Sequence, residues 1–189
     1  MKIAQIPQIF FNSKTNSPFE ECLICNKKLL QVGCEYVVMK SYRYYKEFNK
    51  KDVTYELALC YKCHEMLYES FSEESLARLN TYWENHFKYS RQRKLMDSNN
   101  YNLDEWISCC ACKAIEWNNT TSFHIYGDFV SDKMKFEAPF PYMLSEEVFD
   151  DIVNLLSNHT IDSLTKLFEI YIDFPPQFKS IFSKSIIHK

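Results

Sequence analysis

Two cysteine pairs are the residues of this chain best suited to chemistry. Cys22 and Cys25 form one Cys-x-x-Cys pair, and Cys60 and Cys63 form another. Four thiolates arranged in two such pairs are a common ligand set for tetrahedral zinc, and a zinc ion held by four cysteines has no open coordination position. We therefore expect one structural zinc ion on these residues. A redox dithiol would need only one pair in a thioredoxin-like context, which this sequence lacks.

A third Cys-x-x-Cys pair, Cys109 and Cys112, supplies half of a second metal site. The candidates for its missing ligands are Cys34, Cys110 and His124. The sequence favours another interpretation, in which Cys109 and Cys112 are reduced, partly buried thiols at a local turn and His124, in a strand-like context, is a satisfied core or surface histidine. A second metal ion stays an alternative.

The elements that would position the first four cysteines follow in order along the chain. Residues 35–45 and 53–59 are rich in strand-forming side chains and flank a polar turn at 49–52, which predicts a β-hairpin. The second cysteine pair then runs directly into a segment of helical character. This order of cysteine knuckle, hairpin and helix resembles the treble clef, a zinc-finger motif, over residues 20–70. The resemblance implies a metal-held lobe and no particular activity.

The segment from Leu59 to His64, LCYKCH, is also similar to the end of HNH-type endonucleases, where such a segment closes a treble clef. Those enzymes take a general-base histidine from the hairpin between the two cysteine pairs. Residues 26–59 contain no histidine, so the chain departs from that family at the residue its hydrolytic step requires. We assign no catalytic residue.

The remaining pattern predicts an α+β fold in two parts. In the first part, residues 1–96, a long helix follows the zinc lobe from an N-cap at Ser72 to about Met96, and a polar break at 97–102 ends it. The second part, residues 97–189, carries the third cysteine pair, short strands and C-terminal helices. Its expected elements are strands near 122–130 and 133–138, a helix capped at Ser145, and a helix from Ile161 to about Ile172, ended by Pro175 and Pro176. The two parts share a loose order of elements without a convincing internal repeat.

Composition narrows the classes of function. With only two glycines, the chain cannot contain the glycine-rich phosphate loops of common nucleotide-binding proteins. Met1–Phe11 lacks the continuous apolar stretch of a signal peptide, and no run approaches the roughly 18 apolar residues of a membrane span. We expect a cytoplasmic protein, where thiols stay reduced.

These observations favour a non-enzymatic interaction or adaptor protein with a protein partner, no membrane contact and a structural zinc ion. The first alternative is a nucleic-acid-binding protein that uses the tyrosine-rich basic hairpin and a basic helix end. Its candidate contacts are Lys50, Lys51, Arg91 and Arg93. The second alternative is an enzyme of undetermined type, which a deep pocket with polar groups converging near His124 or Cys110 would favour.

Overall fold

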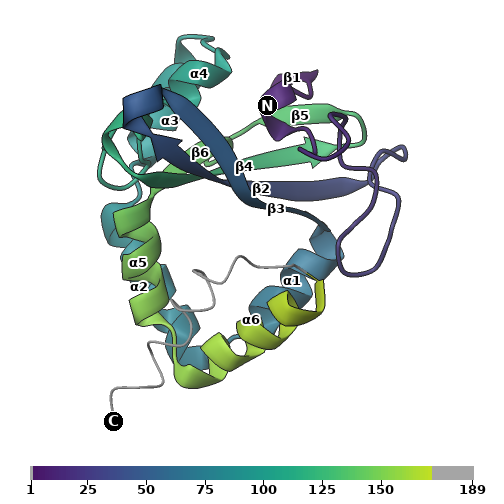
Figure 1. Cartoon of the computed structure of the whole chain (residues 1–189), viewed down its shortest axis with the longest axis vertical. Helices are drawn as coiled ribbons and strands as arrows, with labels where there is room; N and C mark the ends of the chain where they lie inside the picture. Colours follow the sequence, from purple (N-terminus) through teal and green to yellow (C-terminus); the bar gives the residue numbers. More distant parts are fainter. Residues whose placement is uncertain (1, 172–189) are drawn as a thin grey trace.

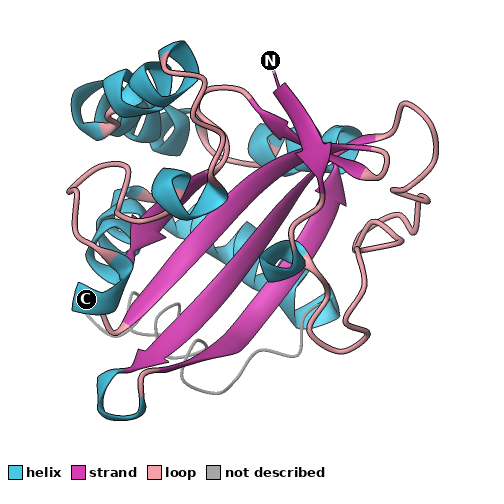
Figure 2. Cartoon of the chain, turned by 90° about the horizontal axis from the view of Figure 1, so that it is seen from above, coloured by secondary structure: helices cyan, strands magenta, loops and turns pink. Residues whose placement is uncertain are grey.

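The computed structural model describes residues 2–171 and has the expected α+β fold, built on one antiparallel sheet (Figures 1 and 2). The sheet has the order β1-β5-β4-β2-β3. Strand β6 also pairs with β4, along residues 123–126, whereas β5 pairs with residues 128–130 of β4. The strands are β1 (Lys2–Gln5), β2 (Glu35–Tyr45), β3 (Lys50–Cys60), β4 (Ser122–Val130), β5 (Lys133–Phe136) and β6 (Tyr142–Ser145). The predicted hairpin is present as β2 and β3, paired from Tyr36↔Cys60 to Tyr45↔Lys50.

Helices pack against this sheet. They are α1 (Tyr61–Glu69), α2 (Glu73–His86), α3 (Tyr89–Asp97), α4 (Leu103–Trp106), α5 (Glu146–Leu155) and α6 (Asn158–Tyr171). Helices α1, α2, α5 and α6 lie below the sheet in Figure 1, and α4 lies above it. Within residues 2–171, no helix is long and apolar enough to cross a membrane. Pro175 and Pro176, expected to end the last helix, lie outside the described residues.

The single long helix expected from Ser72 to Met96 is instead two helices, α2 and α3. Ser72 caps α2 as expected, because its side chain accepts a hydrogen bond from the Ser75 N–H. The helix ends at Phe87, whose backbone is extended and whose ring is buried against Trp83 and Tyr142. The next N–H, that of Lys88, donates to the Ala111 carbonyl. Tertiary packing at this point therefore overrides local helix propensity.

Both parts of the chain, before and after residue 97, supply strands to the one sheet. Strands β2 and β4 pair along their length, from Glu35↔Val130 to Arg43↔Ser122. Strand β1 from the N-terminus pairs with β5. The core is accordingly shared, and its buried members come from segments on both sides of residue 97.

The central strand pair reveals an approximate two-fold symmetry that the sequence does not show. Around the Met39↔Tyr126 pair, β2 and β4 run in opposite directions, and each carries its own hairpin partner on its outer edge. Strand β3 lies beside β2 and leads into α1; strand β6 lies beside β4 and leads into α5. We call residues 21–69 the first unit and residues 109–155 the second unit. In the second unit the outer strand is divided into β5 and β6 by residues 137–141.

One glycine is required by close packing near the centre of the sheet. A Cβ atom on Gly127 of β4 would lie 2.7 Å from the Phe129 ring and 2.9 Å from the Phe10 ring. Both rings are fully buried, Phe10 meets Phe129 edge-on, and Phe129 stacks on Tyr36. The absence of a side chain at residue 127 lets this aromatic cluster close over β4.

Candidate metal centre

The four cysteines of the first two pairs meet at the end of β3. Their sulfur atoms all lie within 4.8 Å of one another, and the Cys25 and Cys60 sulfurs are 3.7 Å apart. Cys22, Cys60 and Cys63 are buried, and Cys25 is exposed. Among the described residues, this is the one group of three or more potential ligands close enough to share a metal ion. The four thiols are therefore close enough together to hold a metal ion.

A tight turn positions the first pair. The Cys22 N–H donates to the Lys27 carbonyl, the Asn26 N–H donates to the Cys22 carbonyl, and Asn26 takes a left-handed conformation with φ of 56°. Asparagine tolerates this conformation better than most residues. The Leu23 N–H donates to the Ala58 carbonyl and so fixes the turn to β3.

The strand-to-helix junction positions the second pair. Cys60 ends β3 and is the N-cap residue of α1, and Cys63 lies in the first turn of that helix. The Cys60 N–H points at the Cys22 sulfur, at 3.4 Å. Burial disfavours the Cys22 thiolate, but backbone N–H groups of Cys25, Cys60 and Ile24 together lower the pKa of Cys22 to about 7. The backbone N–H groups thus favour the thiolate form of Cys22, one of the four potential metal ligands.

The turn at residues 109–116 has the same backbone hydrogen bonds as the turn at residues 21–28. The Cys110 N–H donates to the Ile115 carbonyl, the Ala114 N–H donates to the Cys110 carbonyl, and Ala114 has φ of 58°. Isolated bridges close both turns, Glu21↔Lys28 in one and Cys109↔Glu116 in the other. The Ala111 N–H donates to Met143 of β6, as the Leu23 N–H donates to Ala58 of β3.

This correspondence relates the residues around the third cysteine pair to those of the first unit. Cys110 takes the place that Cys22 has in the first unit, and Lys113 takes the place of Cys25. Cys109 and Cys112, predicted from their spacing, match Glu21 and Ile24, which do not belong to the four-cysteine group of the first unit. A metal ion on Cys109 and Cys112 stays a prediction; the other proposed ligands, Cys34 and His124, belong to no ligand cluster among the described residues.

Cys110 and Cys112 interact directly. The Cys112 thiol donates to the Cys110 sulfur, and this bond, opposed by burial, lowers the pKa of Cys110 to about 5. The same bond and burial raise the pKa of Cys112. Backbone N–H groups of Lys113 and Ser145 also point at the Cys110 sulfur, as those of Cys25 and Cys60 point at Cys22. The N–H donors around the Cys110 sulfur therefore correspond to those around the Cys22 sulfur.

His124 is a core residue and not a ligand in the described structure. It is 2% exposed, its ring stacks on Phe149 at 4.3 Å, and its Nδ1 lies 3.1 Å from the Tyr55 hydroxyl. Burial lowers its pKa to about 3, so the ring is neutral at physiological pH.

The candidate nucleic-acid contacts lie in two different settings. Lys50 pairs with Asp52 at 2.9 Å, and the Lys51 ammonium lies 4.1 Å from the centre of the Trp117 ring. In α3, the Arg91 guanidinium donates to the carbonyls of Glu105 and Trp106 and to the Ser108 hydroxyl, so it ties α3 to the turn that precedes the Cys110 knuckle. Arg93 is exposed. Three of the four cations therefore have partners within the chain.

A buried charged cluster that the sequence did not single out joins the two units. The Lys135 ammonium lies 2.9 Å from carboxylate oxygens of both Asp128 and Glu35 and 3.0 Å from the Tyr61 hydroxyl, which donates to Asp128 at 2.6 Å. The Lys135 and Asp128 side chains are 7% and 9% exposed. Only their tertiary proximity could reveal the cluster, because the four residues come from β5, β4, β2 and α1.

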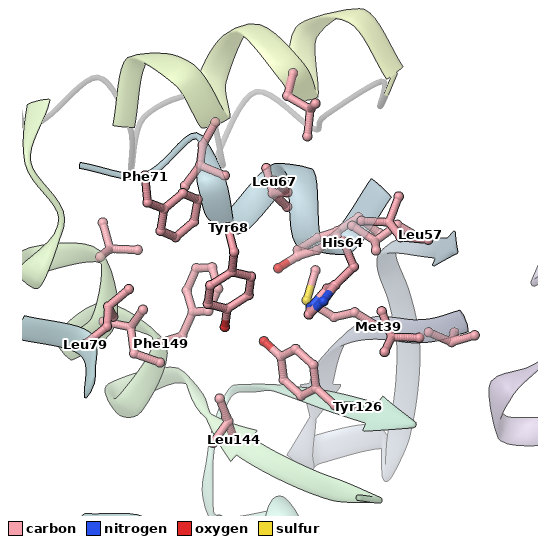
Figure 3. Close-up of a pocket in the computed structure, with 18 of the residues that line it drawn as sticks. Met39, Leu57, His64, Leu67, Tyr68, Phe71, Leu79, Tyr126, Leu144 and Phe149 are labelled. Carbon is pink, nitrogen blue, oxygen red and sulfur yellow. The ribbon is translucent and has the colours of Figure 1, made fainter. Parts of the chain in front are cut away.

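A cavity of about 260 Å³ lies between the sheet and the helices below it (Figure 3). Met39 and Tyr126, the pair at the approximate symmetry axis, both line it, as do the corresponding residues His64 of α1 and Phe149 of α5. The described lining is apolar apart from His64 and four tyrosines, and it contains no carboxylate, thiol, lysine or arginine. Burial lowers the pKa of His64 and raises those of Tyr68, Tyr126 and Tyr142, so these groups are neutral near pH 7.

The cavity does not bring together the groups that would favour an enzyme. Neither His124 nor Cys110 is part of its described lining. The Tyr68 and Tyr126 hydroxyls point toward one another across it (Figure 3), without a neighbouring carboxylate or second histidine that could complete an acid–base pair. The arrangement can accommodate apolar groups and offer them a few neutral hydrogen-bonding partners.

Comparison of the chain with protein-family models, with curated proteins and with solved structures finds no match.

Proposed function

We propose that this chain is a non-enzymatic interaction protein in which a zinc ion on Cys22, Cys25, Cys60 and Cys63 holds a treble-clef lobe in shape. The observation that carries the proposal is the completeness of the four-thiol cluster. Zinc–sulfur bonds of about 2.3 Å in a tetrahedron place neighbouring sulfurs about 3.8 Å apart. The 3.7 Å between the Cys25 and Cys60 sulfurs agrees with that spacing.

The order of elements around the cluster supports the treble clef. The turn at residues 21–28 supplies two ligands, the β2–β3 hairpin follows, and α1 carries the last ligand in its first turn. Four thiolates saturate a tetrahedral ion, so no position remains for a water molecule or a substrate. The ion would then contribute to folding, since binding and folding are linked.

Metal analysis tests the role of the centre. The purified protein is expected to contain one zinc ion per chain. Co²⁺ exchanged into the centre is expected to give the spectrum of tetrahedral thiolate coordination, unchanged by added azide or imidazole, because a closed ion has no exchangeable ligand. A spectral shift on adding azide would show an open position and would contradict a purely structural role.

The proposed interaction role rests on the apolar cavity and on exposed side chains of α1. Met66 and Tyr68 of that helix are 54% and 45% exposed, and tyrosine and methionine are enriched at protein interfaces. An apolar cavity with only neutral polar groups suits the apolar side chains of a protein partner better than a charged substrate. A photoreactive side chain placed at Met66 is expected to cross-link one defined partner. The same group at Val32, which is fully exposed, serves as the matched control and should not cross-link it.

A nucleic-acid partner is the second candidate, and the residues at the tip of the β2–β3 hairpin support it. Phe48 and Tyr45 are exposed there beside Lys46 and Lys50, and aromatic faces next to cations can stack bases and contact phosphates. Titration with oligonucleotides at low salt decides between the two candidates.

A further inference from the structure

The two units correspond at all four ligand positions of the metal centre. Cys22 matches Cys110 and Cys25 matches Lys113 through the shared hydrogen bonds of the two turns. Cys60 matches Ser145, because each ends the outer strand of its unit, pairs with the start of the inner strand (Tyr36 and Phe123), and precedes a helix as its N-cap.

The fourth position follows from the helix. Cys63 is the third residue of α1, and Val148 is the third residue of α5. Val148 is completely buried, and Cys63 is buried at the corresponding position of the first unit. In the second unit, the positions that correspond to the four cysteines are therefore held by Cys110, Lys113, Ser145 and Val148.

The hydrogen bonds to the Cys110 sulfur support the match independently of the order of the elements along the chain. The Cys22 sulfur receives N–H groups from residues 25 and 60, and the Cys110 sulfur receives them from the corresponding residues 113 and 145. Such a cradle stabilises a thiolate that binds a metal ion. In the second unit a thiol, that of Cys112, donates to this sulfur.

We infer that the chain consists of two copies of one metal-binding unit, and that the buried group around Cys110 is the second copy's tetrahedral metal site, with one cysteine ligand kept and three replaced by Lys113, Ser145 and Val148. Hydrogen bonds at Cys110 and apolar packing at Val148 hold together the turn, strand and helix that a metal ion would otherwise cross-link. The inference deepens the proposed function, because it rests on the first centre being a four-thiolate metal site.

The substitutions that would restore the site are conservative in shape. Ser145→Cys and Val148→Cys change side-chain volume little, so the core around them should tolerate both. Lys113→Cys removes a 2.8 Å ion pair with Asp151, in which both side chains are more than a third exposed. Such exposed pairs contribute little to stability.

Titration of the reduced, metal-free full chain with Co²⁺ tests the inference. The thiolate absorption is expected to saturate at one equivalent for the wild type and at two for Lys113→Cys/Ser145→Cys/Val148→Cys. In that triple variant, adding Cys110→Ser is expected to weaken the second site at least tenfold, and adding Cys109→Ser is expected to leave it unchanged. The second comparison separates Cys110 from the pair that spacing alone suggested.

The outcomes are distinct for the two proposals. A wild type that binds no Co²⁺ contradicts the proposed function itself. A wild type that binds two ions, or a folded triple variant that binds one, overturns the inference about the second site while leaving the first centre intact. If the triple variant does not fold, Lys113→Cys/Ser145→Cys keeps Val148 in the core; it supplies three thiolates and is expected to bind a second Co²⁺ ion that does respond to azide. A folded double variant without that second ion also overturns the inference.

Discussion

Cys110 occupies in the second unit the place that Cys22 occupies in the first, with the same turn hydrogen bonds and the same pattern of N–H groups directed at its sulfur. One of these sulfurs has three other thiols around it, and the other has a lysine, a serine and a valine at the corresponding positions. The same backbone arrangement therefore surrounds a four-thiol cluster in one half and a hydrogen-bonded, apolar group in the other.

Loss of one ligand should reduce the stabilising effect of the ion. Cys63→Ser is expected to have a lower Tm than the wild type and a smaller further decrease on addition of a chelator, because three thiolates hold zinc more weakly than four. Thermal unfolding with and without chelator measures this. Cys34→Ser is the matched control, since Cys34 is a buried cysteine outside the cluster, and its Tm should still fall on chelation. Equal responses of the two variants would contradict the assignment of the ligands.

Removing the buried cation at the junction of the units should be costly. Lys135→Met leaves the Asp128 carboxylate buried without its ion partner, and we expect a loss of about 3–5 kcal/mol in the free energy of unfolding. Lys133→Met on the same strand removes an ion pair with Asp132 whose side chains are more than a third exposed, and it should cost less than about 1 kcal/mol. Adding Asp128→Asn to Lys135→Met should recover part of the loss; denaturant titrations that show no recovery would argue against a buried charge as its cause.

A methyl group at residue 127 should disturb the aromatic cluster over β4. Gly127→Ala is expected to lower the free energy of unfolding by about 1–3 kcal/mol, since the added Cβ would come within 3 Å of two buried rings. Adding Phe129→Leu to this variant should cost less than the same change in the wild type, because it relieves the nearest contact. Additive effects in the double variant would show that the two positions do not compete for space.

His124 should make the protein less stable in acid. Its pKa is lowered from 6.5 to about 3 by burial, so between these values the unfolded chain binds a proton that the folded protein does not. The contribution of the neutral ring is fully present above pH 6.5 and decreases by about 1.4 kcal/mol per pH unit as the pH falls toward 3. His124→Asn keeps an acceptor for the Tyr55 hydroxyl but cannot titrate.

Unfolding free energies of the two proteins measured between pH 7 and pH 5 test this. The difference between wild type and His124→Asn should change steadily below pH 6.5, while acid effects on the cysteine centre cancel because both proteins contain it. A difference that is independent of pH would show that His124 is not the titrating group.

Titration with oligonucleotides separates the two candidate partners. The protein-partner proposal predicts flat fluorescence anisotropy at about 50 mM salt, where phosphate contacts are strongest. If binding is seen, Lys50→Glu/Lys51→Glu and Arg93→Glu should weaken it and reduce its salt dependence, in which case the nucleic-acid candidate replaces the protein partner. Arg91 is unsuitable for this test, because its guanidinium holds backbone carbonyls and its loss would disturb the fold.

The sequence by itself determined the elements with strong local signals. The cysteine spacing predicted which four thiols come together, and the strand-forming residues of 35–45 and 53–59 around a polar turn predicted the β2–β3 hairpin. Both are short-range patterns, since knuckle turns and hairpins are specified by the residues within them. The N-cap at Ser72 was found for the same reason.

The tertiary structure alone decided the rest. The break between α2 and α3 depends on Phe87 packing onto distant rings, and the Lys135 cluster assembles from four separate elements. The relation between the two units was hidden because hydrogen bonds of the backbone define it, while the side chains at the matching positions differ in three of four cases. Spacing suggested Cys109 and Cys112 as a pair, but only the folded turn brings the Cys112 thiol against the Cys110 sulfur.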